Sequence, residues 1–140
     1  KFEPTPEDKI IYDEEEEVLE MYFVSEGVIG IGFSLIANGF LDKQYSIAKK
    51  LSGSQIICDH YVVNQCKSQF IYMALEKTEG FALTKKFLHD VIFKKYPDIE
   101  VRMKGSTYNY FKNFIFKPID EHRKREIDMM NVKKCIYRQI

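Results

Sequence analysis

The first half of the chain alternates between short apolar runs and polar turns. Five runs are rich in Ile, Val, Tyr and Phe and are bounded by Gly, Asn, Asp and Ser clusters, a pattern typical of β-strands. Gly27 lies between two runs, as a tight hairpin would require, and Asn38-Gly39 is a strong short hairpin signal. The sequence therefore predicts a sandwich, barrel or roll built from strands at residues 10–12, 21–24, 28–33, 45–51 and 69–74.

The second half of the chain changes to a helical period. Over residues 81–96 apolar positions recur at intervals of three and four, which predicts an amphipathic helix that Pro97 ends. Residues 108–116 are crowded with aromatic side chains, and Pro118 predicts a break or kink in a helix there. From Ile119 onward the charged sequence predicts a helix that needs a partner or frays. Strands followed by helices indicate an α+β fold rather than an alternating parallel sheet.

Length and charge narrow the class of protein. The chain has 140 residues and 45% hydrophobic residues, which suits one domain with a single core. We expect the β-roll to occupy about residues 1–80 and the helices about residues 81–140. The formal net charge is zero, so nothing global marks a nucleic-acid binder. The two ends differ, because residues 1–26 hold ten acids against two lysines and residues 102–140 hold ten Lys/Arg against four acids.

Other chemistries find little support in the sequence. The three cysteines lack a CxxC or Cys/His spacing, and His60, His89 and His122 lie at no mutual ligand spacing, so we expect no disulfide framework and no metal. No nucleophile, base and acid form a recognisable catalytic pattern, so we expect no enzyme. The longest apolar run, ten residues over 28–37, is shorter than the roughly 20 needed to cross a bilayer. The initial lysine suggests a fragment of a larger protein.

Two segments carry a family resemblance. DKIIYDEEEEVLEMYFVSEGVIGIGF at residues 8–33 resembles the opening of a cyclic nucleotide-binding domain, with the acidic turn at 13–17 and a close match over 20–27. EGFALTKKFLHDVIFKKYPDI at residues 79–99 looks like the segment where the roll ends and the second helix begins. The branch that it most resembles is the cytoplasmic domain of voltage-gated and cyclic nucleotide-gated potassium or cation channels.

The resemblance implies a particular architecture and setting. It implies an eight-stranded antiparallel β-roll, jelly-roll-like, followed by C-terminal helices of which the last acts as a lid. The domain would be attached below a tetrameric pore, through a linker on its N-terminal side, on the cytoplasmic face of a membrane. Its partners would be other subunits of the same channel. The ligand would be cAMP or cGMP, with no other cofactor, no nucleic acid and no membrane contact except through the parent protein.

The resemblance also implies where a nucleotide would bind. A cyclic phosphate is best met by backbone N–H groups at a helix N-terminus and a guanidinium, and a carboxylate suits the ribose hydroxyl. In this chain Asp59 would meet the ribose and Lys67 the phosphate, while the main chain of His60 and Tyr61 completes the cradle. The candidate ligand-binding residues are Cys58, Asp59, His60, Tyr61, Lys67 and Ser68.

Each of the four aligned positions departs from the family pattern. Cys58 stands in place of a glycine, Asp59 in place of a glutamate, Tyr61 in place of a small residue and Lys67 in place of an arginine. A lysine keeps the charge but loses the bidentate fork, and one lost charge-assisted hydrogen bond weakens binding by about tenfold or more. The sequence leaves two hypotheses open, a weak nucleotide site or a roll that has kept the fold without the ligand.

Two other classes of function also stay open from the sequence. The chain could be a cAMP- or cGMP-responsive module of a kinase or exchange factor. It could instead be a structural interaction domain whose basic tail contacts a partner or an acidic lipid.

Overall fold

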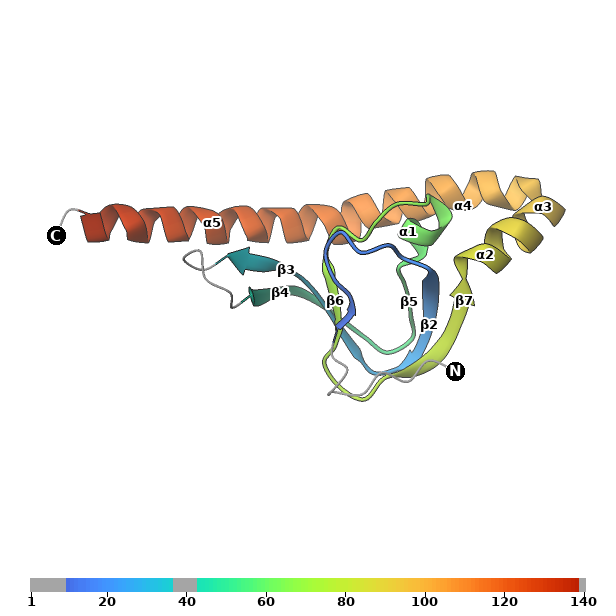
Figure 1. Ribbon diagram of the computed structural model, residues 1–140, viewed down its shortest axis with the longest axis horizontal. Coiled ribbons are helices and arrows are strands. Elements are labelled where there is room, and N and C mark those ends of the chain that lie inside the picture. The colour runs from blue at the N-terminus through green and yellow to red at the C-terminus, as the bar shows by residue number, and fades with distance from the viewer. Residues whose placement is uncertain (1–9, 37–42, 139–140) are drawn as a thin grey trace.

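The computed structural model describes residues 10–36 and 43–138 of the chain. Within them, strands form two antiparallel sheets that face one another as a roll (Figure 1). One sheet has the order β1-β6-β3-β4 and the other has the order β5-β2-β7. In chain order the strands are β1 (Ile10–Tyr12), β2 (Glu20–Glu26), β3 (Val28–Ile36), β4 (Lys43–Ser52), β5 (Gln55–Ile57), β6 (Ile71–Ala74) and β7 (Glu79–Thr84).

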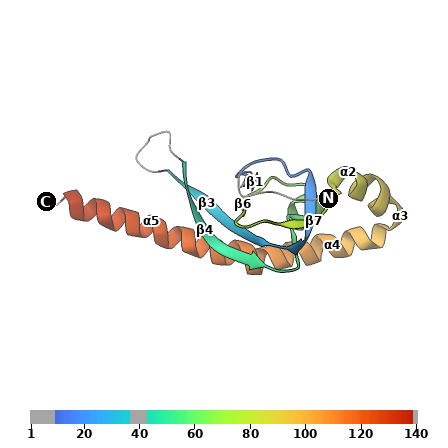
Figure 2. The same cartoon turned by 90° about the horizontal axis from the view of Figure 1, so that it is seen from below.

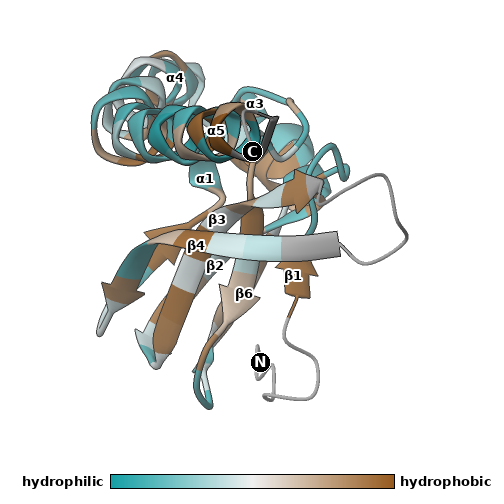
Figure 3. Cartoon of the chain, turned by 90° about the vertical axis from the view of Figure 1, so that its left-hand side faces the viewer, coloured by the Kyte–Doolittle hydropathy of each residue, from teal (hydrophilic) through white to brown (hydrophobic). Residues whose placement is uncertain are grey.

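All five predicted strands are confirmed, and two further strands were missed. β5 is short and begins with Gln55 directly after a polar turn, and β7 overlaps the region predicted as helix at residues 81–84. The described residues therefore contain seven strands where the resemblance implies eight. Side chains that alternate along these strands point into the roll, where Ile29, Ile31 and Phe33 of β3 are almost fully buried. Figure 3 shows apolar residues gathered on the strands.

The predicted hairpin at Gly27 is wrong, because β2 and β3 belong to different sheets. Gly27 instead carries the chain from one sheet to the other at a φ of +124°, a value that L residues rarely adopt. A Cβ at this position would also collide with Thr78. The Asn38-Gly39 turn lies outside the described residues, but β3 and β4 do pair antiparallel from Val28 opposite Ser52 to Ile36 opposite Lys43.

The first helix begins later than the sequence predicts. Residues 81–84 pair with β2 as part of β7, so the helical run starts at α2 (Lys85–Phe87), where the Thr84 hydroxyl caps the Phe87 N–H at 3.1 Å. It continues as a π-helical segment, η2 (Leu88–Ile92), and ends with α3 (Phe93–Lys95). The π-turn shifts the buried face, so Leu88 and Phe93 are buried while Phe87 and Val91 are exposed.

The last helices form one long run across the roll (Figures 1 and 2). α4 (Pro97–Tyr110), η3 (Phe111–Phe116) and α5 (Lys117–Arg138) follow one another without a gap. The expected interruption at Pro118 takes the form of the π-helical segment η3 rather than a break. Proline lacks the N–H that an α-helix would aim at the carbonyl of Phe114, and the Lys49 ammonium of β4 donates to that carbonyl instead.

The two halves of this run meet the roll differently. Ile119 is fully buried and Glu126 accepts a hydrogen bond from Ser46 of β4 at 2.9 Å, so the first part of α5 is anchored. Beyond Glu126 the helix extends past the sheets toward the C-terminus (Figure 2), and Met129 and Val132 are exposed. Among the described residues no helix is long and apolar enough to cross a bilayer.

Candidate functional site

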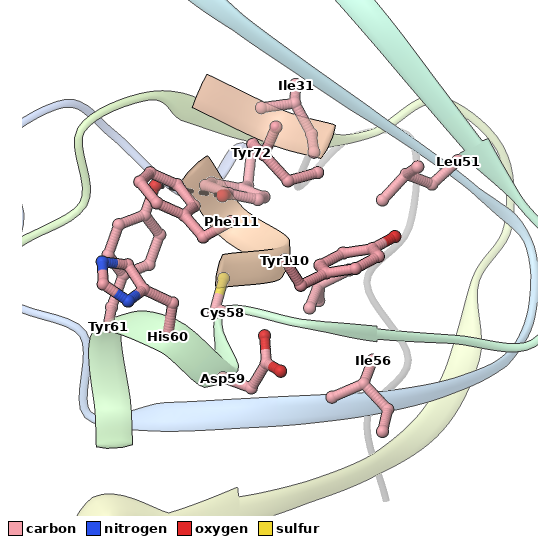
Figure 4. Close-up of a pocket in the computed structure, with 12 residues that line it drawn as sticks. Ile31, Leu51, Ile56, Cys58, Asp59, His60, Tyr61, Tyr72, Tyr110 and Phe111 are labelled. Atoms are coloured by element: carbon pink, nitrogen blue, oxygen red, sulfur yellow. Dashed lines mark hydrogen bonds between the residues drawn. The ribbon is translucent and has the colours of Figure 1, made fainter. Parts of the chain in front are cut away.

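The site is built around a short helix that follows β5. Cys58 precedes α1 (Asp59–Val63) in the left-handed conformation, with a φ of 64°. This region of backbone space favours glycine, the residue that the family resemblance places here. Cys58 is buried, as are His60 and Tyr61. The structure therefore brings four of the candidate residues, Cys58, Asp59, His60 and Tyr61, to one cavity wall (Figure 4).

These four residues line a cavity together with side chains from β3, β6 and η3, and it is called the cavity behind α1 below. This cavity is almost completely filled. Its free volume is about 20 Å³, which leaves room for little more than one water molecule. Phe111 from η3 fills it, stacking on His60 with ring centroids 4.3 Å apart and an angle of 14° between planes, and meeting Tyr61 edge-on at 5.3 Å. Phe111 is only 6% exposed. The end of α4 together with η3, called the lid below, thus packs on the roll through Phe111 and Ile115, while Tyr108, Tyr110 and Phe114 stay about half exposed.

His60 is fixed by polar contacts as well as by stacking. The Asn64 side-chain amide lies 3.0 Å from His60 Nδ1 and 3.2 Å from Thr107 Oγ1 of α4, so it bridges α1 to the lid. The Cys66 sulfur lies 3.7 Å from His60 Nε2. Burial lowers the pKa of His60, because its charged form would lose solvation between these rings. The neutral imidazole is therefore the form that suits this packing.

Tyr61 fills the place where a small residue was expected. Its hydroxyl accepts a hydrogen bond from the Tyr72 hydroxyl of β6 at 3.0 Å, and the two rings meet edge-on at 5.8 Å. Burial raises the pKa of both phenols, so both stay protonated. Ser68 is also buried, and its hydroxyl donates to the Phe70 carbonyl at 2.7 Å. The Tyr61 contact joins α1 to β6, whereas the Ser68 contact is local to the turn before β6.

Lys67 is placed differently from the other candidates. Its side chain is exposed and does not line the cavity. Among the described residues no lysine or arginine lines the cavity wall, so no cationic side chain stands where a phosphate would be held. Its assignment as the phosphate ligand stays a prediction.

Asp59 occupies the boundary between this cavity and a second, open groove. The groove lies in front of α1, between the β5-β2 edge and α4, and has a volume of about 510 Å³. Burial raises the pKa of Asp59, an effect that the His60 backbone N–H partly offsets. No sequence pattern predicted the groove, because its walls combine β2 and the unpredicted strand β5 with the polar face of α4. Its lining consists of Phe23, Val24, Ser54, Gln55, Ile56, Asp59, Ser106, Thr107 and Tyr110.

The comparisons with known proteins support the fold. Neither protein-family models nor curated protein sequences match the chain significantly. Among solved structures, the Thermus thermophilus catabolite activator protein superposes with a TM-score of 0.59 at 13% identity, over 91% of this chain and 52% of that one. The cAMP-bound EAL enzyme Bd1971 gives 0.58 at 14% identity, over 98% of this chain and 33% of that one.

A third structure matches in the same way. A cyclic nucleotide-binding domain from Methylobacillus flagellatus gives a TM-score of 0.54 at 10% identity, over 76% of this chain and 61% of that one. The chain therefore spans less than two thirds of the length of each of these proteins. At such low identities the likeness concerns the fold alone. The chain has the cyclic nucleotide-binding fold, an antiparallel β-roll with C-terminal helices.

Proposed function

We propose that this chain is a non-enzymatic regulatory module of a tetrameric, potassium-selective cation channel, on the cytoplasmic face of the membrane. Its fold supports a regulatory role, and the sequence pattern at residues 8–33 and 79–99 supports the channel setting. Other subunits of the same channel are its partners. In this proposal the cavity holds the protein's own aromatic side chains in place of a cyclic nucleotide.

One observation supports the proposal that the protein's own side chains replace a nucleotide: the cavity is already filled. Small-ligand pockets commonly have volumes of roughly 300 Å³ or more, whereas the space behind α1 is about 20 Å³. A cyclic nucleotide could enter only if Phe111 left its stack on His60 and the lid moved. The lid is also held by the bridge from Asn64 to Thr107 and by the contact of Lys49 with Phe114.

Regulation then follows from the position of the lid. A ligand or partner shifts such an equilibrium only by as much as it prefers one state over the other. Side chains that fill the cavity make the closed state the resting state, without any ligand. Movements of the α4 to α5 run would be the signal passed to the rest of the channel.

Titration calorimetry of the chain with cAMP and cGMP tests the self-occupied cavity. We expect no saturable heat for either nucleotide up to millimolar concentration. Saturable binding at micromolar concentration would overturn it, because that affinity, about −8 kcal/mol, requires a formed site. The Lys67→Ala variant would then decide the ligand set, since a phosphate ligand lost at this position weakens binding by about tenfold or more.

The channel setting needs a separate test on the complete protein. Expressed in oocytes, it should carry potassium currents, and substitution of Phe111 by alanine should shift their voltage or ligand dependence. Expression at the cell surface without any current would contradict this part of the proposal and leave the cavity result untouched.

A second candidate is a cAMP- or cGMP-responsive module of a kinase or exchange factor. It is favoured by the likeness in fold to the regulatory domain of Toxoplasma gondii PKA crystallised with cAMP, which has a TM-score of 0.54 at 14% identity over 72% of this chain. This candidate requires the calorimetric titration to give binding. A calorimetric titration without binding heat, together with a potassium current from the complete protein, excludes this second candidate.

A further inference from the structure

The open groove in front of α1 is large enough for a small molecule even though the cavity behind α1 is not. Its volume of about 510 Å³ lies within the range of ligand pockets, roughly 300 to 1,000 Å³. Asp59, Ile56 and Tyr110 line both spaces. A molecule in the groove can therefore reach Asp59 without displacing Phe111 from the cavity.

The charge in the groove selects the class of ligand. Among the described residues, Asp59 is the one acidic side chain in the groove wall, and no lysine or arginine lies beside it there. A carboxylate in partly buried surroundings repels an anion such as a phosphate and gains most from a cation. The Asp59 carboxylate therefore disfavours the binding of a cyclic nucleotide, whose phosphate is an anion, in this groove.

The rest of the wall suits an organic cation rather than a metal ion. Phe23, Ile56 and Tyr110 expose 40%, 48% and 44% of their surfaces beside Asp59. In Figure 4, Asp59 is drawn toward Ile56 and Tyr110 and away from the His60 ring. Aromatic faces attract a nearby cation and cover its hydrocarbon part. Among the described residues no three metal-ligating side chains gather together.

Two serine hydroxyl groups also line the groove. Ser54 precedes β5 and Ser106 belongs to α4, and neither makes a side-chain hydrogen bond to another described residue. Both can accept from a donor-rich ligand. A carboxylate, two aromatic rings and free hydroxyls together match an ammonium group carried on an apolar or aromatic body.

We propose that this groove binds a small organic cation, a primary or secondary amine with an aromatic or aliphatic body, with Asp59 as its counter-ion. Such a ligand contacts β5 on one side and α4 on the other. It therefore biases the position of the lid from outside the filled cavity. The proposed amine site does not depend on the channel setting or on nucleotide binding. Each of these three proposals can therefore be wrong while the other two hold.

Three probes that differ in one end group test the proposal directly. Tyramine has an ammonium, 4-ethylphenol has only a hydrogen atom in its place, and 3-(4-hydroxyphenyl)propionate has a carboxylate. In NMR titrations of the ¹⁵N-labelled chain at pH 7, we expect tyramine to bind at least about tenfold more tightly than 4-ethylphenol. The carboxylate probe should give no saturable shift, and the amides that move should be those of Phe23, Ser54 and Ser106.

Matched variants separate the charge at Asp59 from general electrostatics. Asp59→Asn should reduce the affinity for tyramine to that for 4-ethylphenol, whereas Asp98→Asn in the first turn of α4 should leave it unchanged. Tyr110→Leu, which leaves Asp59 in place, should weaken tyramine by a few fold. Circular dichroism shows whether each variant is folded. Equal affinity for the three probes, or an Asp59→Asn variant that binds tyramine as the wild type does, would overturn the proposal.

Discussion

The cavity behind α1 and the groove in front of it share three residues, yet they differ in almost every physical property. The cavity, of about 20 Å³, is closed by Phe111 stacked on a neutral His60. The groove, of about 510 Å³, is open and is lined by the Asp59 carboxyl group. One helix, α4 with η3, makes both, because its buried face fills the roll while its polar edge stands away from β5. A roll of this kind can lose one binding space to packing and still offer another.

The largest effect should come from emptying the cavity. Phe111→Ala removes a buried ring and should cost about 3–5 kcal/mol of unfolding free energy, measured by urea denaturation. The control is Phe114→Ala in the same π-helical segment. Phe114 is 54% exposed, so its loss should cost less than about 1 kcal/mol. Similar costs for the two variants would show that Phe111 does not fill the cavity in solution.

A smaller effect on the stability of the fold should follow from acidification, and it should arise from His60 in the cavity. Burial lowers the pKa of His60, so the unfolded chain binds the proton more readily than the folded one. Stability should therefore fall as the pH drops below about 6.5, the pKa of an ordinary histidine. The melting temperature of His60→Phe should fall less over this interval than that of the wild type. A parallel decline of both proteins would assign the pH dependence to other groups.

The smallest effect on stability should arise from Asp59 in the groove. Its contribution to stability should improve on acidification, whereas that of His60 should worsen. Burial raises the pKa of Asp59, so its charged form costs stability at neutral pH, and this cost vanishes below about pH 3.9, where the unfolded chain is also protonated. Asp59→Asn should thus melt at a higher temperature than the wild type at pH 7. That gain should shrink toward pH 4. An Asn variant that is less stable at pH 7 would show that the carboxylate is stabilised by contacts within the protein.

Several features of the fold and site could be predicted from the sequence because they depend on neighbours along the chain. Short apolar runs bounded by turn residues located β1, β2, β3, β4 and β6, and Pro97 located the end of a helix. The family pattern also brought Cys58 to the turn before α1, where its left-handed backbone occupies the place of a glycine. The exposed position of Lys67 could not be predicted in this way.

The errors arose where a distant segment decided the outcome. Residues 81–84 have a helical spacing of apolar side chains, but β2 supplies hydrogen-bond partners that make them a strand. Gly27 has the sequence of a hairpin, but its neighbours pair in different sheets. Pro118 should interrupt its helix, but a π-turn and Lys49 satisfy the backbone around it.

By itself, the sequence determined that this protein is an α+β chain with a roll of short strands followed by helices. Periodicity reports which face of an element is buried, and that information is local. Only the tertiary structure decided that Phe111 occupies the cavity, that Lys67 points to solvent and that Asp59 faces an open groove. The filled cavity and the open groove both depend on where a helix some 50 residues further along the chain comes to rest, and no local pattern specifies such a placement.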